Sequence, residues 1–254
     1  MSNRPNPERL GGETAPVRPL SIGFAVPDAD RIAAMTPRAP APAEAPPPSG
    51  KTFVLGVSGA SGAPYAVRLL EQMLLSGATV HAVVSEYGQR LLFDELGIRR
   101  VDLEQMTPNL VESSACADEL GKRFIAHPNK DVGAVIASGS FLHDGMAVMP
   151  CSSTTLGAIA TGAGSNLLTR AAMVTLKERR PLVIGHREMP LNLIDIENMR
   201  ALALAGATPC SPNPGFYLLP TSLHDVVDFT VGKVLDLLGV EHRLKTRWED
   251  HHSK

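Results

Sequence analysis

The chain has 254 residues, a formal net charge of −2 at neutral pH and hydrophobic residues at 44% of its positions. The near-neutral charge, with basic residues scattered along the chain, argues against a nucleic-acid surface, and no window approaches the ~20 apolar residues of a membrane span. The three cysteines, Cys116, Cys151 and Cys210, lack metal-ligand spacing. They indicate reduced thiols in a cytoplasmic compartment, and we expect Cys151 to be a small buried side chain.

The first fifty residues differ from the rest of the chain. They hold about half of the 21 prolines and show no sustained apolar period. This composition predicts a disordered, proline-rich N-terminal extension over residues 1–50, and it matches neither a secretory signal nor an acid-poor transit peptide. Residues 51–254 suit a single domain with a sizeable core.

Residues 52–64 (TFVLGVSGASGAP) join a β-branched apolar run to a Gly/Ser turn and the start of a helix. Gly59 and Gly62 allow a sharp turn, and the hydroxyls of Ser58 and Ser61 lie beside the N–H groups of the next helix. The spacing is neither that of a dinucleotide fingerprint nor that of a P-loop. The stretch predicts a buried strand ending in an anion-binding loop, although such a turn also serves simply to pack a helix on a sheet.

The next segments alternate between helical and extended patterns. A helix over 66–75, a strand over 79–84, a helix over 87–96 and a short strand over 124–126 are predicted. The mixed segment 98–122 fits helix or loop, and 132–137 is ambiguous between helix and strand.

A second strand followed by a hydroxyl-rich turn begins at residue 145. The apolar run 145–149 stops at Pro150 and is followed by Cys151 and four hydroxyl residues, 152–155. Capping of the next helix explains one or two of these hydroxyls. The remaining hydroxyls suit a ligand with phosphate or polar ring atoms.

The C-terminal half continues the alternation, with predicted helices over 166–178, 194–205 and 222–238, a strand over 182–185, a short extended piece over 207–209 and a proline-rich loop over 212–220. Alternating strands and helices imply a parallel sheet covered on both faces. Ligands of such sheets bind beyond the carboxyl ends of the strands. We therefore expect Ser61, Ser85, the hydroxyls of 152–155, and Arg187 with Glu188 to share one rim.

Six motifs in this order resemble the UbiX family of flavin prenyltransferases. They are 56–62 (GVSGASG), 137–140 (ASGS), 149–152 (MPCS), 176–183 (LKERRPLV), 187–188 (RE) and 214–217 (PGFY). The resemblance covers about residues 51–250. It implies a Rossmann-like (flavodoxin-like) three-layer α/β sandwich in a homo-oligomeric, dodecameric enzyme.

The resemblance also implies a reaction. A dimethylallyl group passes from dimethylallyl monophosphate to N5 and C6 of reduced FMN, and UbiD-type decarboxylases use the prenylated flavin. The residues that would hold FMN are Gly59, Ala60, Ser61, Ser85, Ser152, Ser153, Thr154, Thr155 and Arg187. The residues that would bind the donor phosphate are Tyr217, Lys233, Arg170 and Lys177, some of them across a subunit boundary.

The residue types suit this chemistry. A departing phosphate needs cations and hydrogen-bond donors, and Glu188 would act as its general acid. Ser61 would relay the proton lost from the flavin ring, and Trp248 would stabilise the cation-like allyl fragment. The eight histidines are scattered and no Asp-rich diphosphate motif occurs, so a metal-free mechanism is expected.

Several of these candidate site residues also have a plain structural explanation. Lys177 and its neighbours suit a solvated helix end, Arg187 and Glu188 suit a surface pair, and Trp248 suits a hydrophobic anchor. The chain departs from the family at two positions. Val132 stands where some members carry a tryptophan, which affects the cation cage, and Lys233 replaces a common arginine.

Two other functions fit parts of the pattern. An FMN-dependent decarboxylase of cysteinyl peptides shares the flavin-binding sheet. It needs a histidine near the second strand, which Ser85-Glu86-Tyr87 does not offer, and a Pro-x-Met-Asn segment, which Met189-Pro190-Leu191-Asn192 does not reproduce. A non-catalytic flavin-binding subunit would not need Lys177, Glu188, Tyr217 and Lys233 together. The donor preference between mono- and diphosphate, the decarboxylase served and the role of residues 1–50 stay open.

Overall fold

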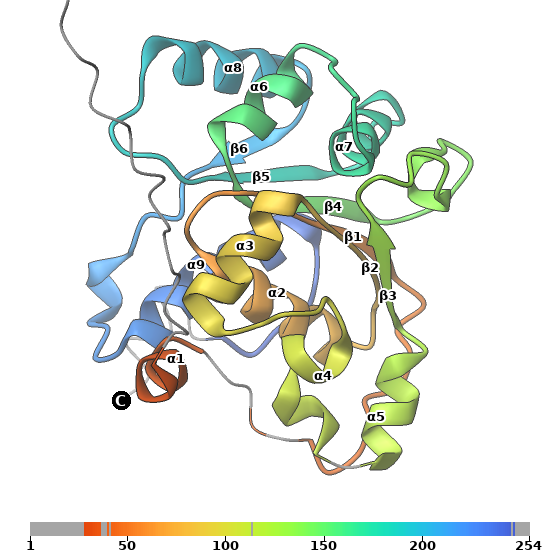
Figure 1. Ribbon diagram of the computed structural model, residues 1–254, viewed down its shortest axis with the longest axis vertical. Helices are drawn as coiled ribbons and strands as arrows, with labels where there is room; N and C mark the ends of the chain where they lie inside the picture. The colour runs from red at the N-terminus through yellow and green to blue at the C-terminus, as the bar shows by residue number, and fades with distance from the viewer. Residues whose placement is uncertain (1–27, 37–39, 41, 113, 245, 247–254) are drawn as a thin grey trace, which may run out of the picture.

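The computed structural model describes residues 28–36, 40, 42–112, 114–244 and 246 (Figure 1). Within these residues the strands form a parallel six-stranded sheet in the order β3-β2-β1-β4-β5-β6. The strands are β1 (Thr52–Val57), β2 (Thr79–Val84), β3 (Phe124–Pro128), β4 (Gly145–Cys151), β5 (Leu182–His186) and β6 (Thr208–Cys210). The strand order reverses between β1 and β4, and ligand crevices of doubly wound sheets lie at such a point.

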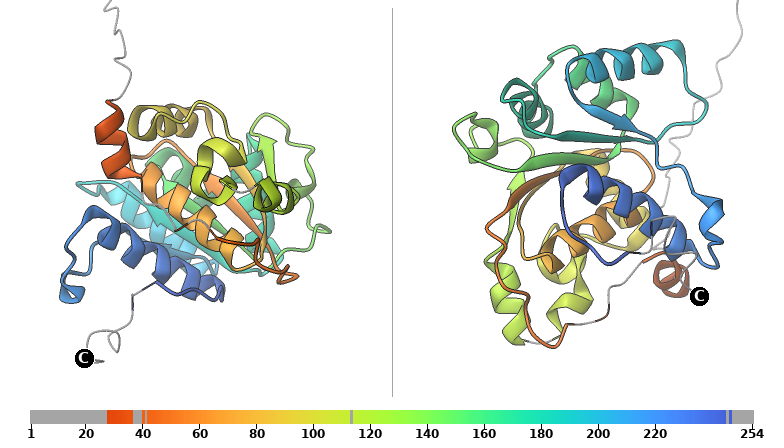
Figure 2. Two further views of the ribbon diagram at one scale, coloured as in Figure 1. Left: turned by 90° about the horizontal axis from the view of Figure 1, so that it is seen from below. Right: turned by 180° about the vertical axis from the view of Figure 1, so that it is seen from behind.

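Helices cover both faces of the sheet (Figures 1 and 2). One layer holds α2 (Ala63–Leu75), α3 (Glu86–Leu96), α4 (Leu103–Met106), α5 (Ser114–Gly121) and α9 (Leu223–Leu238). The other layer holds α6 (Ser153–Ala160), α7 (Leu167–Lys177) and α8 (Leu193–Leu204). Short 3-10 turns occur at η1 (Pro108–Val111), η2 (Val135–Ala137) and η3 (Phe216–Leu218). The predicted three-layer α/β sandwich is confirmed.

Strand β1 shows how the sequence produces two cores. Phe53, Leu55 and Val57 belong to the apolar cluster under α2 and α9, whereas Val54 belongs to the cluster under α6 and α7. Successive side chains of a strand point to opposite faces, so a continuous apolar run is required when both faces are covered. The run of β-branched and apolar residues that marked this strand in the sequence reflects its central position.

Local signals set most helix ends. Ser222 caps α9, with Asp225 completing a capping box, as its position in the sequence predicted. Asn166 caps α7 through the N–H of Thr169. Gly97 ends α3 in the left-handed conformation.

Some segments differ from the sequence-based expectations. Strand β4 continues through Pro150 to Cys151, because Pro150 lies in an irregularity of the β4–β5 register, where no ladder donor is needed. Strand β3 extends to Pro128, the segment 98–122 contains α4, η1 and α5, and 132–137 ends in the 3-10 turn η2.

The prediction of disorder for residues 1–50 is wrong for part of that segment. Residues Ala29–Met35 form α1, which lies against α3 and α9 (Figure 2). Asp28 caps α1 by accepting hydrogen bonds from two backbone N–H groups. Farther along, Pro46 O accepts a hydrogen bond from Arg123 at 3.0 Å, and Ser49 N donates to Gly77 O at 2.9 Å. Residues 1–27 lie outside the described part of the chain.

Candidate active site

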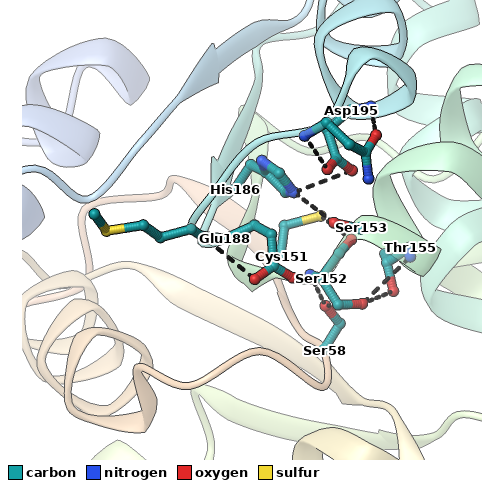
Figure 3. Close-up of polar contacts among 10 residues, drawn as sticks. Ser58, Cys151, Ser152, Ser153, Thr155, His186, Glu188 and Asp195 are labelled. Carbon is teal, nitrogen blue, oxygen red and sulfur yellow. Dashed lines mark hydrogen bonds and ion pairs between the residues drawn. The ribbon is translucent and has the colours of Figure 1, made fainter.

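Two loops meet at the point where the strand order reverses. The loop after β1 and the turn after β4 are joined through Ser58, whose N–H donates to Pro150 O at 3.1 Å. The Ser58 hydroxyl oxygen accepts from Ser152 N at 2.8 Å (Figure 3). Ser58 is fully buried. Its hydroxyl therefore fixes the relative position of the two loops.

The four hydroxyls after β4 have different partners. Ser152 caps α6, because its oxygen accepts from Thr155 N at 3.3 Å and its hydroxyl lies 3.2 Å from the Thr155 hydroxyl. Ser153 instead lies 3.1 Å from a ring nitrogen of His186, and Thr154 is exposed. Helix capping therefore accounts for one of the four hydroxyls, that of Ser152, and the Thr155 hydroxyl accepts a hydrogen bond from it.

The loop after β1 differs from the predicted anion site. The N–H groups of Gly62 and Ala63, at the start of α2, donate to the carboxylate of Glu95 at 3.0 and 2.8 Å. A negative group does lie at this helix N-terminus, as the dipole favours, but it belongs to α3 of the same chain. Sequence reasoning missed Glu95, because it lies 32 and 33 residues from its two partners and carries no local motif.

Close packing against α3 explains why residue 59, in the loop after β1, is a glycine. A Cβ at Gly59 would lie 2.4 Å from the Cβ of Tyr87, in the first turn of α3. Ser85 caps α3 through the N–H of Gly88 at 3.0 Å. Ser85 and Tyr87 also line an open groove of about 400 Å³ together with Asn129. Gly59 thus brings the rim of the groove close to the loop.

Arg187 links the loop after β1 to the end of β4. Its Nε donates to Ser61 O at 3.1 Å, and its backbone N–H donates to Cys151 O at 3.1 Å. Ala60 is buried beside Ser61, whereas Ser61 itself is exposed. Glu188 follows on the exposed side and accepts a hydrogen bond from Met189 N at 3.1 Å. The expectation that strand ends gather Ser61, Arg187 and the hydroxyl turn on one rim is confirmed.

A buried histidine lies behind the hydroxyl turn. His186, the last residue of β5, is 0% exposed, and its Nε2 lies 3.9 Å from the carboxylate of Asp195 on α8. Burial lowers the pKa of His186, and the nearby Asp195 partly offsets this effect. Sequence reasoning missed both residues, although the place of His186 directly before Arg187 was a usable signal.

Tyr217 contacts α9, the helix that carries Lys233. The Tyr217 ring, in η3, packs edge-on against Phe229, with ring centroids 5.7 Å apart. Lys233 follows Phe229 by four residues, so it lies one turn farther along the same helix face. Both candidate phosphate-binding side chains are exposed.

The structure does not bring Lys177 to this rim within one chain. Lys177 ends α7, before β5, and forms an exposed ion pair with Glu178 at 2.6 Å. Arg187 follows β5, so the two are separated by the length of that strand, about 16 Å. Arg170 lies on the exposed surface of α7. Trp248 falls outside the described residues.

Other features bear on alternative chemistries. Cys151 is fully buried, as expected, and burial raises the pKa of its thiol. All three cysteines are free.

Among the described residues, no group of three or more histidine, cysteine or acidic side chains is placed to hold a metal ion. In the same part of the chain, no helix has the length and apolar character needed to cross a bilayer.

Comparison with known proteins identifies the family. The profile of the Flavoprotein family matches residues 44–235. The flavin prenyltransferase UbiX of Halalkalibacterium halodurans is 45% identical over 205 residues, which cover 80% of this chain and 97% of that protein. UbiX of Thermoplasma acidophilum is 41% identical over 77% of this chain and 99% of its own length. The chain belongs to the UbiX flavin prenyltransferase family.

Solved structures agree with this assignment. AnUbiX, crystallised in complex with FMN and dimethylallyl pyrophosphate, is 34% identical with a TM-score of 0.63, covering 77% of this chain and 97% of its own. A dodecameric FMN-dependent UbiX-like decarboxylase from Escherichia coli O157:H7 is 38% identical with a TM-score of 0.64, covering 78% and 98%.

Proposed function

We propose that this protein is a flavin prenyltransferase that joins the dimethylallyl group of dimethylallyl monophosphate to N5 and C6 of reduced FMN. The observation that carries the proposal is the similarity to flavin prenyltransferases over almost their entire length. The geometry supports it, because Ser61, Arg187 and the hydroxyl turn meet on one rim. The same similarity argues against a cysteinyl-peptide decarboxylase.

The donor groups on this rim fit FMN. A phosphate and a flavin ring present oxygen acceptors, and the rim offers hydroxyls and a guanidinium. Arg187 is held beside Ser61 with its side chain partly accessible, and Thr154 is exposed at the start of α6. The residues that would hold FMN are Gly59, Ala60, Ser61, Ser85, Ser152, Ser153, Thr154, Thr155 and Arg187. When bound, reduced FMN supplies the nucleophilic ring positions.

A second copy of the chain completes the phosphate site. Tyr217 packs against Phe229 of α9, the helix that also carries Lys233, but Lys177 lies at the far end of β5 from Arg187. Lys177 and Arg170 would therefore act on the donor phosphate bound by a neighbouring subunit. This requires a homo-oligomer, and a dodecamer like the one named for the Escherichia coli relative is the proposed assembly.

Different side chains of this protein would carry out different steps of the prenyl transfer. As the phosphate leaves with the electron pair of its C–O bond, Glu188 donates a proton to it, and the cations and Tyr217 stabilise its charge. Ser61 would relay the proton that C6 of the flavin loses when the second bond forms, and this loss balances the proton that the allyl double bond gains in the same step. Trp248 would stabilise the cation-like allyl fragment. The prenylated flavin then serves a UbiD-type decarboxylase in the cytoplasm.

One assay tests this function directly. Purified protein is incubated with reduced FMN and dimethylallyl monophosphate in metal-free buffer, and the flavin is analysed by mass spectrometry. We expect the flavin mass to increase by one C5H8 unit. Folded, FMN-loaded protein that leaves the flavin mass unchanged with both the mono- and the diphosphate would support the non-catalytic alternative.

The acid role of Glu188 is tested by Glu188→Gln. The amide cannot donate a carboxylic proton, so we expect adduct formation to slow by about a hundredfold or more while FMN affinity is retained. The control is Glu197→Gln, which changes an exposed carboxylate on α8 that pairs with Arg200. Equal rates for wild-type protein and Glu188→Gln would remove the acid role.

A further inference from the structure

Two buried polar side chains, those of His186 and Asp195, lie behind Ser153 of the hydroxyl turn (Figure 3). His186 lies between Ser153, whose hydroxyl is 3.1 Å from Nε2, and Asp195, whose Oδ1 is 3.9 Å from the same nitrogen. His186 is 0% exposed and Asp195 is 2% exposed, so only Ser153 extends toward the rim. Neither His186 nor Asp195 has a role in the proposed chemistry.

The position of the ring proton follows from this geometry. Burial lowers the pKa of His186, so at neutral pH the ring is neutral and carries one N–H. Its Nδ1 is buried and, among the described residues, has no hydrogen-bond partner. A buried N–H without a partner is rare, whereas Nε2 faces both a hydroxyl and a carboxylate. The proton is therefore placed on Nε2.

Asp195 is itself fixed in place. Its Oδ2 accepts a hydrogen bond from Asn192 N at 3.3 Å, and its backbone N–H donates to the Asn192 side chain at 2.9 Å, which forms the capping box of α8. This leaves Oδ1 facing His186. The carboxylate thus favours the Nε2–H tautomer through its field, without a direct hydrogen bond.

The tautomer determines what Ser153 offers a ligand. If Nε2–H donates to the Ser153 oxygen, the hydroxyl hydrogen of Ser153 is directed elsewhere. Ser153 is half-buried at the start of α6, where the rim is open. The opposite tautomer would consume that hydrogen and leave Ser153 as an acceptor.

We propose that His186, held by Asp195, is a positioning residue that makes Ser153 a hydrogen-bond donor to an oxygen acceptor of bound FMN. The proposal rests on the proposed function in taking FMN as the ligand. It does not require that prenyl transfer occur.

Binding of FMN to variants tests the coupling between Ser153 and His186. We expect Ser153→Ala to weaken FMN binding about five-fold, the value of one neutral hydrogen bond. His186→Leu should weaken it by a similar factor, and the double variant should be no weaker than either single variant. His186→Gln, whose amide nitrogen replaces Nε2 as a donor, should bind FMN nearly as tightly as the wild type.

A second measurement needs no FMN and reads the ring of the wild-type protein directly. Nitrogen-15 NMR of histidine-labelled, FMN-free protein reports which ring nitrogen carries the proton, with His186 assigned by its absence in His186→Gln. We expect Nε2–H in the wild type and a larger Nδ1–H population in Asp195→Asn. A wild-type ring protonated on Nδ1 would overturn the proposal.

The binding outcomes separate this proposal from the function. Wild-type FMN affinity in His186→Leu, or effects that multiply in the double variant, would overturn the role of His186 even if prenyl transfer is observed. A wild-type protein that binds FMN without forming the adduct would overturn the proposed function. Non-additive effects of the Ser153 and His186 variants on FMN affinity would still support the positioning role of His186.

Discussion

At the scale of single residues, several polar groups of the rim bind the chain itself. Ser58 and Ser152 tie two loops together, Ser85 caps α3, and Glu95 binds the first N–H groups of α2. These interactions set the shape of the rim before any ligand is present. Several side chains of the rim are exposed or half-exposed and so accessible to a ligand, among them Ser61, Ser153, Thr154, Arg187 and Glu188.

Glu95 is expected to hold the loop after β1 in place. Glu95→Gln keeps the shape but loses the charge that accepts from Gly62 N and Ala63 N at the positive end of the α2 dipole. We expect the free energy of unfolding to fall by about 1–2 kcal/mol and FMN affinity to decrease. Urea denaturation and FMN titration measure these two quantities.

Asp94→Asn is the matched control for Glu95→Gln. Asp94 is the neighbouring acid on α3 and pairs at the surface with Arg90 at 2.6 Å. Such pairs contribute little, so this variant should change stability by less than about 0.5 kcal/mol. If both variants behave alike, the capping role of Glu95 is wrong.

At the scale of elements, the β2 and β3 strands share a histidine cluster with the segment before β4. His81 Nδ1 lies 2.9 Å from His127 Nε2 with the rings stacked, and Phe141 meets His81 edge-on. His143 is buried, and its Nδ1 lies 3.1 Å from Gly145 O. Burial lowers the pKa of all three rings. Burial, together with the nearby His127 and His143, lowers the pKa of His81 to about 4.

This cluster predicts acid sensitivity. The pKa of His81 in the folded protein, about 4, lies below its ordinary value of 6.5, so between these limits the unfolded chain binds a proton that the folded chain does not. Stability must therefore decrease as the pH falls from about 6.5 to 4. We expect urea denaturation across this range to show a smaller decrease for His81→Gln than for the wild type.

His224→Gln is the control, because His224 lies on α9, outside the cluster. It should leave the pH dependence of the unfolding free energy as in the wild type. An identical pH dependence in His81→Gln and the wild type would show that the cluster does not contribute.

At the scale of the whole molecule, an N-terminal helix is added to the family domain. The family profile begins at residue 44, and α1 precedes it. Met35 packs against the large apolar cluster, and Ile32 lies against Gly97, where a Cβ would come within 2.9 Å of the Ile32 Cδ1. α1 therefore adds apolar contacts to the layer of α3 and α9.

Removing these contacts should affect stability and leave the site intact. We expect Ile32→Ala combined with Met35→Ala to lower the free energy of unfolding by about 1–3 kcal/mol, because two partly buried side chains are truncated. FMN affinity should stay unchanged. Arg31→Ala, an exposed change on the same helix, is the control. A double variant as stable as the wild type would show that α1 does not stabilise the domain.

The sequence by itself determined the layers of this protein and most element types. Apolar runs with turn residues at their ends specified the strands, and caps such as Ser222 specified helix starts, because these signals are local. The rim was predictable in outline, since parallel strands place their carboxyl ends at one edge. The family was likewise identifiable from the motifs and their order, because both are properties of the sequence alone.

Only the tertiary structure decided which polar groups pair across the rim. Glu95 reaches the start of α2 from another helix, and His186 meets Ser153 and Asp195 from separate elements. Such contacts depend on how the layers pack, so sequence spacing carries no signal for them. The same holds for Lys177, whose distance from Arg187 follows from the direction of β5, and for α1, whose packing the proline-rich composition around it obscured.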